Sequence, residues 1–343
     1  PAAEKAFHQV GEVSVINGDE KITQTGAVGP FEFLSTIRKS TVVLWGTKSL
    51  AVDGEKVTIH YQKPTPGSKV LRGGLKYKIE GATPLQKADF ISLMIALFLG
   101  TASLPHVLIR YYTVPSPKDA RKSTIVAIAS IGFFYILTLF MGLGAMVNGV
   151  INLLDNNMSA PLLAYSFGVF LFAAISALAF ATVLGTVSGL IVAASGAVAH
   201  DIMDRFLNMR LSDSKKVMAG KISAIVVGCI AMFFGIIFKG VNVSFLVGWA
   251  FAVAASANLP AILMLLFWKR TTAQGIVASI LVGIVSALGI ILLSPDMYKI
   301  YGKLPQDALI SFNNPALFSV PLSFLALIVV SLMTKGTAKD AEA

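Results

Sequence analysis

"ALAFATVLGTVSGLIVAASGAVAHD", residues 177–201, decides the fold class of this 343-residue chain. The stretch belongs to a longer run, from Asn156 to His200, that contains no Asp, Glu, Lys or Arg. A second run without these residues covers 123–154. A helix needs only about 20 apolar residues to cross the hydrocarbon core of a bilayer, and these runs lack the alternation of a membrane β-strand. The sequence therefore predicts membrane-spanning helices.

The composition supports the same class. Hydrophobic residues make up 55% of the chain and charged residues only 13%, whereas soluble domains carry about 25% charged residues. The net charge of +10 is spread over short loops between apolar segments, so we expect no nucleic-acid partner. The chain is predicted to be an all-α polytopic membrane protein whose surroundings are the lipid bilayer.

Seven apolar windows have the length of membrane spans. They cover approximately 89–112, 123–148, 163–198, 216–238, 243–268, 272–293 and 315–334. Residues 88–343 are therefore expected to form a transmembrane domain with seven helices. Residues 1–87 differ, because they hold 12 Lys or Arg and 8 Asp or Glu together with turn signals and β-branched stretches. They are expected to form a small mixed or β-rich extracytoplasmic segment.

The loop charges predict the orientation of the spans. The side of the membrane where spans one, three, five and seven end collects thirteen Lys or Arg in the loops and at the window ends, whereas the opposite side after residue 88 has three. The positive-inside rule then places the C-terminus in the cytoplasm and residues 1–87 outside, in a multi-pass inner-membrane protein. An odd number of spans that starts outside is unusual, so we expect an N-terminal transmembrane half that this sequence lacks.

The motif "GTASLPH", residues 100–106, is unusual for the middle of a span. Gly100 and Pro105 are expected to break the helix there, and Thr101, Ser103 and His106 add polar groups. Free backbone at membrane depth needs protein or a wet cavity beside it, and transporters use such broken helices as binding sites. The alternatives are a proline kink that only shapes packing and a histidine bonded to a neighbouring carbonyl.

Two further spans carry polar groups. Thr182 and Thr186 of span three are four residues apart and share a helix face with Gly185 nearby, so their oxygens are candidate ligands for a hard cation. The alternative is that both hydroxyls bond to carbonyls of their own helix. In span five, Asn258 and Pro260 repeat the combination of a polar residue and a proline, and we expect a second interrupted helix that faces a cavity.

No sequence pattern predicts an enzyme. The chain has no phosphate-binding GxxxxGK[ST] loop, no GxGxxG after a strand and no zinc-binding HExxH. Cys229 is the single cysteine, so Cys-based metal sites are excluded. We expect no cofactor other than a coupling ion.

Three ordered motifs resemble the sodium/solute symporter family, and within it the cation/acetate symporter branch. They are "FISLMIALFLGTASLPHVLIRYYTVPSPKDARKS" at 90–123, "LAFATVLGTVSGLIVAASGAVAHDIM" at 178–203 and "GWAFAVAASANLP" at 248–260. The resemblance covers about 88–293. It implies a LeuT-like fold of two inverted repeats, of which this chain would contain the second repeat and the C-terminal helices.

The resemblance also implies site residues. Thr101, Ser103 and His106 fall on the stretch that lines the substrate, and we add Asn258 from span five. Thr182, Gly185 and Thr186 fall on the sodium-site stretch, with Thr182 and Thr186 as the Na⁺ ligands. Many members have two adjacent hydroxyl residues where this chain has Gly185 and Thr186, which leaves Na⁺ and H⁺ both open as the coupling ion.

The expected function is symport of a small organic anion, such as the short-chain monocarboxylate acetate, with Na⁺ or H⁺. The first broken helix, which completes both sites, would lie in the missing N-terminal half. The alternatives are a symporter for another solute (an amino acid, a sugar or a vitamin), a membrane sensor derived from a transporter domain, and a channel.

Overall fold

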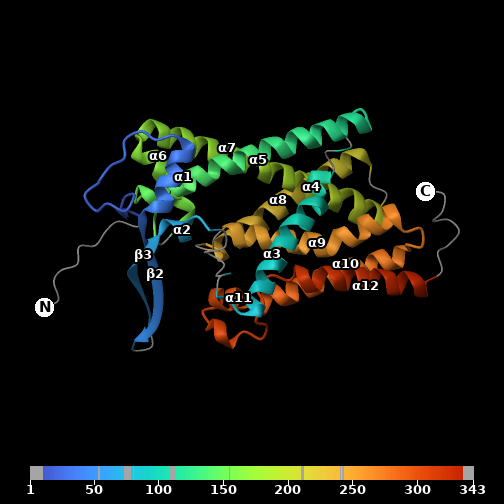
Figure 1. The fold of residues 1–343 in the computed structure, drawn as a ribbon. Coiled ribbons are helices and arrows are strands. Elements are labelled where there is room, and N and C mark those ends of the chain that lie inside the picture. The colour runs from blue at the N-terminus through green and yellow to red at the C-terminus, as the bar shows by residue number, and fades with distance from the viewer. Residues whose placement is uncertain are drawn as a thin grey trace. The chain divides into compact units, whose positions relative to one another are not determined.

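The computed structural model describes residues 11–52, 55–72, 79, 81–108, 111, 113–153, 155–209, 212–239, 241 and 243–334, which form mostly helices and one small sheet (Figure 1). The elements are, in chain order, β1 (Val13–Val15), α1 (Pro30–Lys39), β2 (Thr41–Val52), β3 (Glu55–Pro66), α2 (Gly67–Val70), α3 (Pro84–Ser103), α4 (Pro105–Leu108), α5 (Pro117–Val147), η2 (Asn156–Met158), α6 (Ser159–Ser166), α7 (Val169–Gly196), η3 (Ala197–Phe206), α8 (Asp213–Ile237), α9 (Val243–Phe267), α10 (Ala273–Leu292), α11 (Pro295–Ile300), η4 (Pro305–Asp307) and α12 (Ala316–Met333).

Seven helices in the described part of the chain are long and apolar enough to cross a membrane, which confirms the predicted number of spans. They are α3, α5, α7 with the first part of η3, α8, α9, α10 and α12. The predicted sides of the membrane stay a prediction, and the C-terminal residues 335–343 lie outside the described residues.

The third predicted window, 163–198, is two helices in the structure. Helix α6 ends at Ser166, and the amide of Gly168 donates to the Tyr165 carbonyl at 3.0 Å. Gly168 has a φ of 126°, so the chain turns there before α7 begins at Val169. The span continues through the π-helical turns of η3 to Met203. Apolar composition continues across this turn, which is why hydropathy alone does not separate the two helices.

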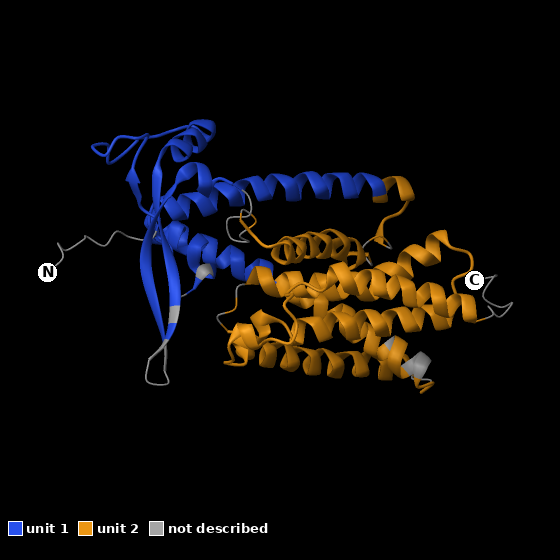
Figure 2. Ribbon diagram, turned by 60° about the horizontal axis from the view of Figure 1, so that its bottom comes forward, with its two compact units in different colours: residues 1–77, 121–184 blue, residues 78–120, 185–343 orange. Residues whose placement is uncertain are grey.

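The chain divides into two compact units, which are coloured separately in Figure 2. Unit 1 consists of residues 1–77 and 121–184, and unit 2 consists of residues 78–120 and 185–343. This division follows contacts within the chain, whereas the predicted boundary at residue 87 separates segments by their side of the membrane.

Unit 1 contains the sheet that the composition of residues 1–87 indicates. Its strand order is β1-β2-β3, and β2 pairs with β3 in an antiparallel register from Thr41 opposite Pro66 to Val52 opposite Glu55. Val42 and Val43 are buried where β1, β2 and β3 meet. The ring centroids of Phe33 in α1 and Phe140 in α5 are 6.1 Å apart, so aromatic packing joins α1 to the long helix of this unit.

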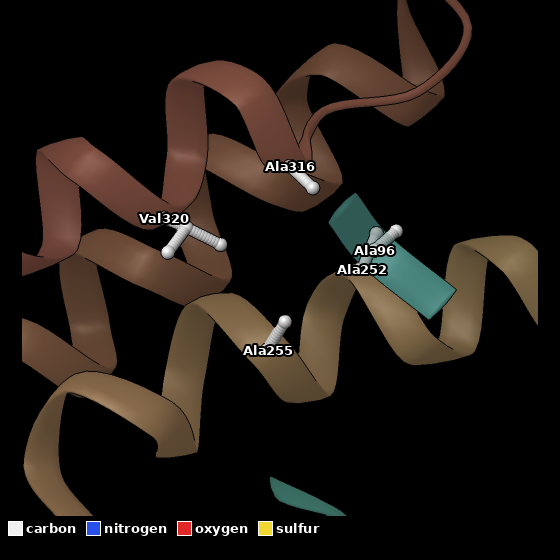
Figure 3. Close-up of a cluster of buried hydrophobic side chains, with 5 residues drawn as sticks. All are labelled: Ala96, Ala252, Ala255, Ala316 and Val320. Carbon is white, nitrogen blue, oxygen red and sulfur yellow. The ribbon is translucent and has the colours of Figure 1, made fainter. Parts of the chain in front are cut away.

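Unit 2 is built around α3, α9, α10 and α12, which pack against one another. The contact of α3, α9 and α12 is made of small side chains, which Figure 3 shows turned toward one another: Ala96, Ala252, Ala255, Ala316 and Val320. Small residues let the backbones of neighbouring helices approach closely, which is how helices associate when lipid offers no hydrophobic driving force.

Buried serines add hydrogen bonds between these helices. The hydroxyl oxygens of Ser256 in α9 and Ser319 in α12 lie 2.6 Å apart. Those of Ser279 in α10 and Ser323 in α12 lie 2.9 Å apart. All four serines are fully buried. A hydrogen bond between membrane helices contributes about 0.6 kcal/mol on average, so these contacts fix the relative positions of α9, α10 and α12 with a moderate gain in stability.

Helix α9 approaches α10 closely at Gly283. A Cβ added to Gly283 would lie 2.1 Å from the Ser256 carbonyl oxygen. In a regular helix this carbonyl accepts a hydrogen bond from residue 260, but Pro260 has no N–H to donate. The absent side chain of Gly283 therefore leaves room for a carbonyl that lacks its usual partner.

Helix α3 ends in the middle of the "GTASLPH" motif. Its last residue is Ser103, Leu104 has extended backbone angles (φ −71°, ψ 119°), and α4 begins at Pro105. Proline disfavours the helical conformation in the residue that precedes it, which explains the angles of Leu104.

Gly283→Ala is expected to destabilise unit 2, because the new methyl group would overlap the Ser256 carbonyl. Overpacking of this kind typically costs about 1–3 kcal/mol, so the thermal unfolding temperature of the detergent-solubilised protein should fall. Gly289→Ala is the matched control on the same helix, since no atom lies within 4 Å of a Cβ there. Equal unfolding temperatures for the two variants would contradict this description of the α9–α10 contact.

Pro105→Ala is expected to make α3 and α4 continuous. The alanine supplies an N–H that can donate to the Thr101 carbonyl, and it removes the restriction on Leu104. Hydrogen–deuterium exchange of the amides between 104 and 108 should slow by about 2- to 10-fold, the range that one net hydrogen bond gives.

The matched control for this experiment is Pro260→Ala, because α9 is already a continuous helix through Pro260. Exchange around position 260 should change little. Unchanged exchange between 104 and 108 in Pro105→Ala would show that something other than Pro105 ends α3.

Candidate functional site

The end of α3 concentrates the polar groups of the "GTASLPH" motif. The Thr101 hydroxyl donates to the Leu97 carbonyl at 2.6 Å. The Ser103 hydroxyl lies 3.0 Å from the Leu99 carbonyl oxygen and 3.2 Å from that of Gly100. Thr101 is exposed and Ser103 is fully buried. Both hydroxyl protons are therefore used inside α3, and the hydroxyl oxygens keep only their lone pairs for another group.

The break also leaves backbone carbonyls without their helical donors. Pro105 has no N–H for the Thr101 carbonyl. The carbonyls of Thr101 and Ala102 have no hydrogen bond to any residue that the structure describes. The C-terminal end of a helix also carries a partial negative charge. These oxygens therefore suit a cation or a hydrogen-bond donor better than a carboxylate group.

Asn258 lies at the same place. Its side-chain amide donates to the Ser103 carbonyl at 3.1 Å, although the two residues are 155 positions apart in the sequence. Of the predicted substrate residues, the structure thus joins Ser103 and Asn258 directly by a hydrogen bond.

His106 lies in α4 and is half-buried. Within the described residues, no hydrogen bond holds its ring. The ring nitrogens of His106 are therefore available to a group from outside this part of the chain.

Two of the predicted helix breaks are wrong. Gly100 lies inside α3, and a Cβ there would be 2.5 Å from the Phe251 carbonyl oxygen, so this glycine permits close packing of α3 on α9. Pro260 lies inside α9, which continues from Val243 to Phe267. Pro260 is fully buried whereas Pro105 is exposed. The packing of α3, α10 and α12 around α9 keeps the helical path despite the missing hydrogen bond.

The predicted ion ligands lie on α7. Thr182, Gly185 and Thr186 are all exposed. The Thr182 hydroxyl donates to the Leu178 carbonyl at 2.8 Å, as the alternative interpretation expects. No hydrogen bond links Gly185 or Thr186 to the end of α3 in the described part of the chain. The described residues therefore supply oxygens on one helix face but no closed coordination shell.

The sequence did not predict the hydrogen bonds that tie the opposite end of α3, at Asp89, to the segment before α12. One carboxylate oxygen of Asp89 accepts hydrogen bonds from the backbone amides of Asn313 at 2.9 Å and Asn314 at 2.8 Å. Nearby, the Ser92 hydroxyl accepts from the Leu317 amide at 2.9 Å. A lone carboxylate at the edge of an apolar window is the signal that points to this anchor, but its partners are more than 200 positions away.

A groove beside α3 has a different character. It lies between α3 and α12, has a volume of about 500 Å³ and is lined by apolar residues: Ile91, Met94, Ile95, Phe98, Leu99, Ala316, Leu317, Val320 and Pro321. Such a lining suits hydrocarbon, and none of the predicted polar site residues contributes to it.

Comparison with known proteins agrees with this description. A "Monocarboxylic acid transporter" of Corynebacterium glutamicum is 46% identical over 285 residues, which are 80% of this chain and 51% of that protein. An "Uncharacterized symporter YwcA" of Bacillus subtilis is 41% identical over 283 residues, which are 80% of this chain and 54% of that protein. The chain thus spans about half the length of these relatives.

The family comparison covers more than half of the chain. No solved structure matches the chain, so the expected LeuT-like repeat stays a prediction. Residues 42–283 match the sequence model of the sodium:solute symporter family, whose members are transporters and not enzymes. Together with the seven spans and the interrupted helix, this match shows that the chain belongs to the sodium:solute symporter family.

Proposed function

We propose that the protein to which this chain belongs is a symporter that moves a short monocarboxylate, such as acetate, into the cell with a coupling cation. The observation that carries the proposal is the interruption at Leu104, where the apolar helix α3 ends at Ser103 and the short helix α4 begins at Pro105. A break of this kind presents helix ends to a ligand, and transporters of known mechanism use such ends for their substrates and ions. The Corynebacterium glutamicum relative named "Monocarboxylic acid transporter" supports the substrate class.

The chemistry at the break suggests separate roles for its groups. The carbonyls of Thr101 and Ala102, which have no donor among the described residues, are acceptors, so they favour the cation or a protonated group. The His106 ring, with no hydrogen bond to a described residue, is the donor that we assign to the substrate carboxylate. Ser103 and Thr101 would contribute hydroxyl donors only after releasing the carbonyls that they now bind.

The coupling ion is proposed to be Na⁺, with H⁺ as the alternative. The Thr186 hydroxyl and the Thr182 carbonyl would be ligands from α7, because oxygen atoms are the ligands that hard cations prefer. Thr186 has no hydrogen bond to a described residue through its side chain, so its hydroxyl is available. The protein would lie in the cytoplasmic membrane with its C-terminus inside, as the loop charges indicate.

The whole protein in proteoliposomes should accumulate radiolabelled acetate when Na⁺ is supplied outside, and a proton gradient alone should give little uptake. Acetate uptake that a proton gradient drives without Na⁺ would show that H⁺, and not Na⁺, is the coupling ion. Binding of monocarboxylates without any gradient-driven uptake would favour a sensor, and uptake of only other solutes would overturn the substrate class.

Thr186→Val is expected to raise the Na⁺ concentration for half-maximal uptake by roughly tenfold, equivalent to about 1.4 kcal/mol. The valine keeps the shape of the side chain but removes the oxygen. Thr182→Val is the matched control on the same face, because the Thr182 hydroxyl is already bound to the Leu178 carbonyl. An unchanged Na⁺ dependence in Thr186→Val, measured under the same uptake conditions, would refute the assignment of this hydroxyl.

A further inference from the structure

The hydrogen bond between Asn258 and Ser103 is a contact between two helices at the point where one of them is broken. The Asn258 Nδ2 atom lies 3.1 Å from the Ser103 carbonyl oxygen. Ser103 is fully buried and Asn258 is half-buried in the face of α9 that meets α3. The contact is thus internal to unit 2.

The break explains why this carbonyl needs a partner from another helix. In a continuous helix the Ser103 carbonyl would accept a hydrogen bond from the amide of Val107. Here the Val107 amide donates to the Leu104 carbonyl at 3.0 Å instead. A buried carbonyl without a donor costs about 1–3 kcal/mol. The Asn258 amide therefore takes the place of the Val107 amide, which the break before Pro105 turns away from the Ser103 carbonyl.

A second contact holds the end of α3 on α9 near Asn258. Gly100 packs against the Phe251 carbonyl two helical turns earlier on α9. The end of α3 is therefore held on α9 by one close backbone contact and one side-chain hydrogen bond.

We propose that Asn258 is a positioning residue that holds the interrupted end of α3 on α9, and not a ligand of the substrate. By holding the Ser103 carbonyl in place, Asn258 fixes the position of its neighbours on both sides of the break. These are the carbonyls of Thr101 and Ala102, which have no donor among the described residues, and the ring of His106. The consequence for transport rests on the proposed function, whereas the positioning itself does not.

The positioning is tested by cysteine labelling in the whole protein without other cysteines, with Cys229→Ser included. Leu104→Cys places a thiol at the break, where residue 104 is half-buried. Adding Asn258→Leu, which has a similar shape and no donor, should raise the rate of maleimide labelling by about 2- to 10-fold, the range for the loss of one neutral hydrogen bond.

Two further variants separate positioning from general loosening of the bundle. Ser256→Ala removes another buried hydrogen bond of α9, to Ser319 of α12, and should leave labelling at Leu104→Cys within about 2-fold of the parent protein. Asn258→Gln keeps an amide donor and should label more slowly than Asn258→Leu. Equal labelling with and without Asn258→Leu would overturn the proposal, as would an equal rise in Ser256→Ala.

Uptake kinetics provide the second readout. If Asn258 positions the site, Asn258→Leu should raise the KM for the solute by about 2- to 10-fold with a smaller change in kcat, and Asn258→Gln should restore part of the affinity. A KM that is the same in Asn258→Leu as in the parent protein would overturn the role in transport. Absence of monocarboxylate uptake in the parent protein would refute the proposed function, while the labelling result would still decide the positioning.

Discussion

A backbone carbonyl buried in a protein needs a donor, and this requirement governs the structure around the end of α3. The break at Leu104 removes the helical donors of several carbonyls at once. The Ser103 hydroxyl lies 3.2 Å from the Gly100 carbonyl oxygen, and the Asn258 amide satisfies the Ser103 carbonyl at 3.1 Å. The carbonyls of Thr101 and Ala102 have no donor among the described residues. Protein groups thus satisfy the carbonyls of Gly100 and Ser103, and the carbonyls of Thr101 and Ala102 mark where a ligand can donate a hydrogen bond.

The same requirement explains why α9 continues through Pro260 whereas α3 ends before Pro105. Pro260 removes the donor of the Ser256 carbonyl, yet α9 stays continuous because its neighbours surround it and Gly283 leaves room for that carbonyl. Pro105 is exposed, so no comparable packing opposes the change in direction. Proline therefore marks a weak point in a helix, and the surrounding helices decide whether the helix breaks there.

The sequence predicts much of the fold, because membrane spans depend on local composition. Charge-free runs and their lengths were sufficient to predict seven spans, and Pro105 correctly located the end of α3. The turn at Gly168 was missed, since apolar residues continue on both sides of it. Contacts between distant segments were also missed: Asp89 meets Asn313 and Asn314 after more than 200 residues, and no local pattern contains such a pairing.

The candidate site was harder to predict than the fold, for a chemical reason. A serine or threonine in a helix can offer its hydroxyl to a ligand or return it to a carbonyl of the preceding turn, and the residue type is the same in both cases. Thr101, Ser103 and Thr182 all bind carbonyls of their own helix. Asn258 was singled out as a polar residue in a span, but its partner Ser103 is visible only after folding.

The sheet of unit 1 has a consequence for the pairing of this protein with other strands. In the order β1-β2-β3, the outer side of β3 is an open edge among the described residues. An open edge invites another strand to pair with it, and this is a common start of aggregation. Pro64 and Pro66 cannot donate to such a strand, and Lys63 adds charge beside them. The end of β3 near α2 is therefore protected against fibril-like growth by its own sequence, whereas Val57–Tyr61 is a stretch of the same strand without proline.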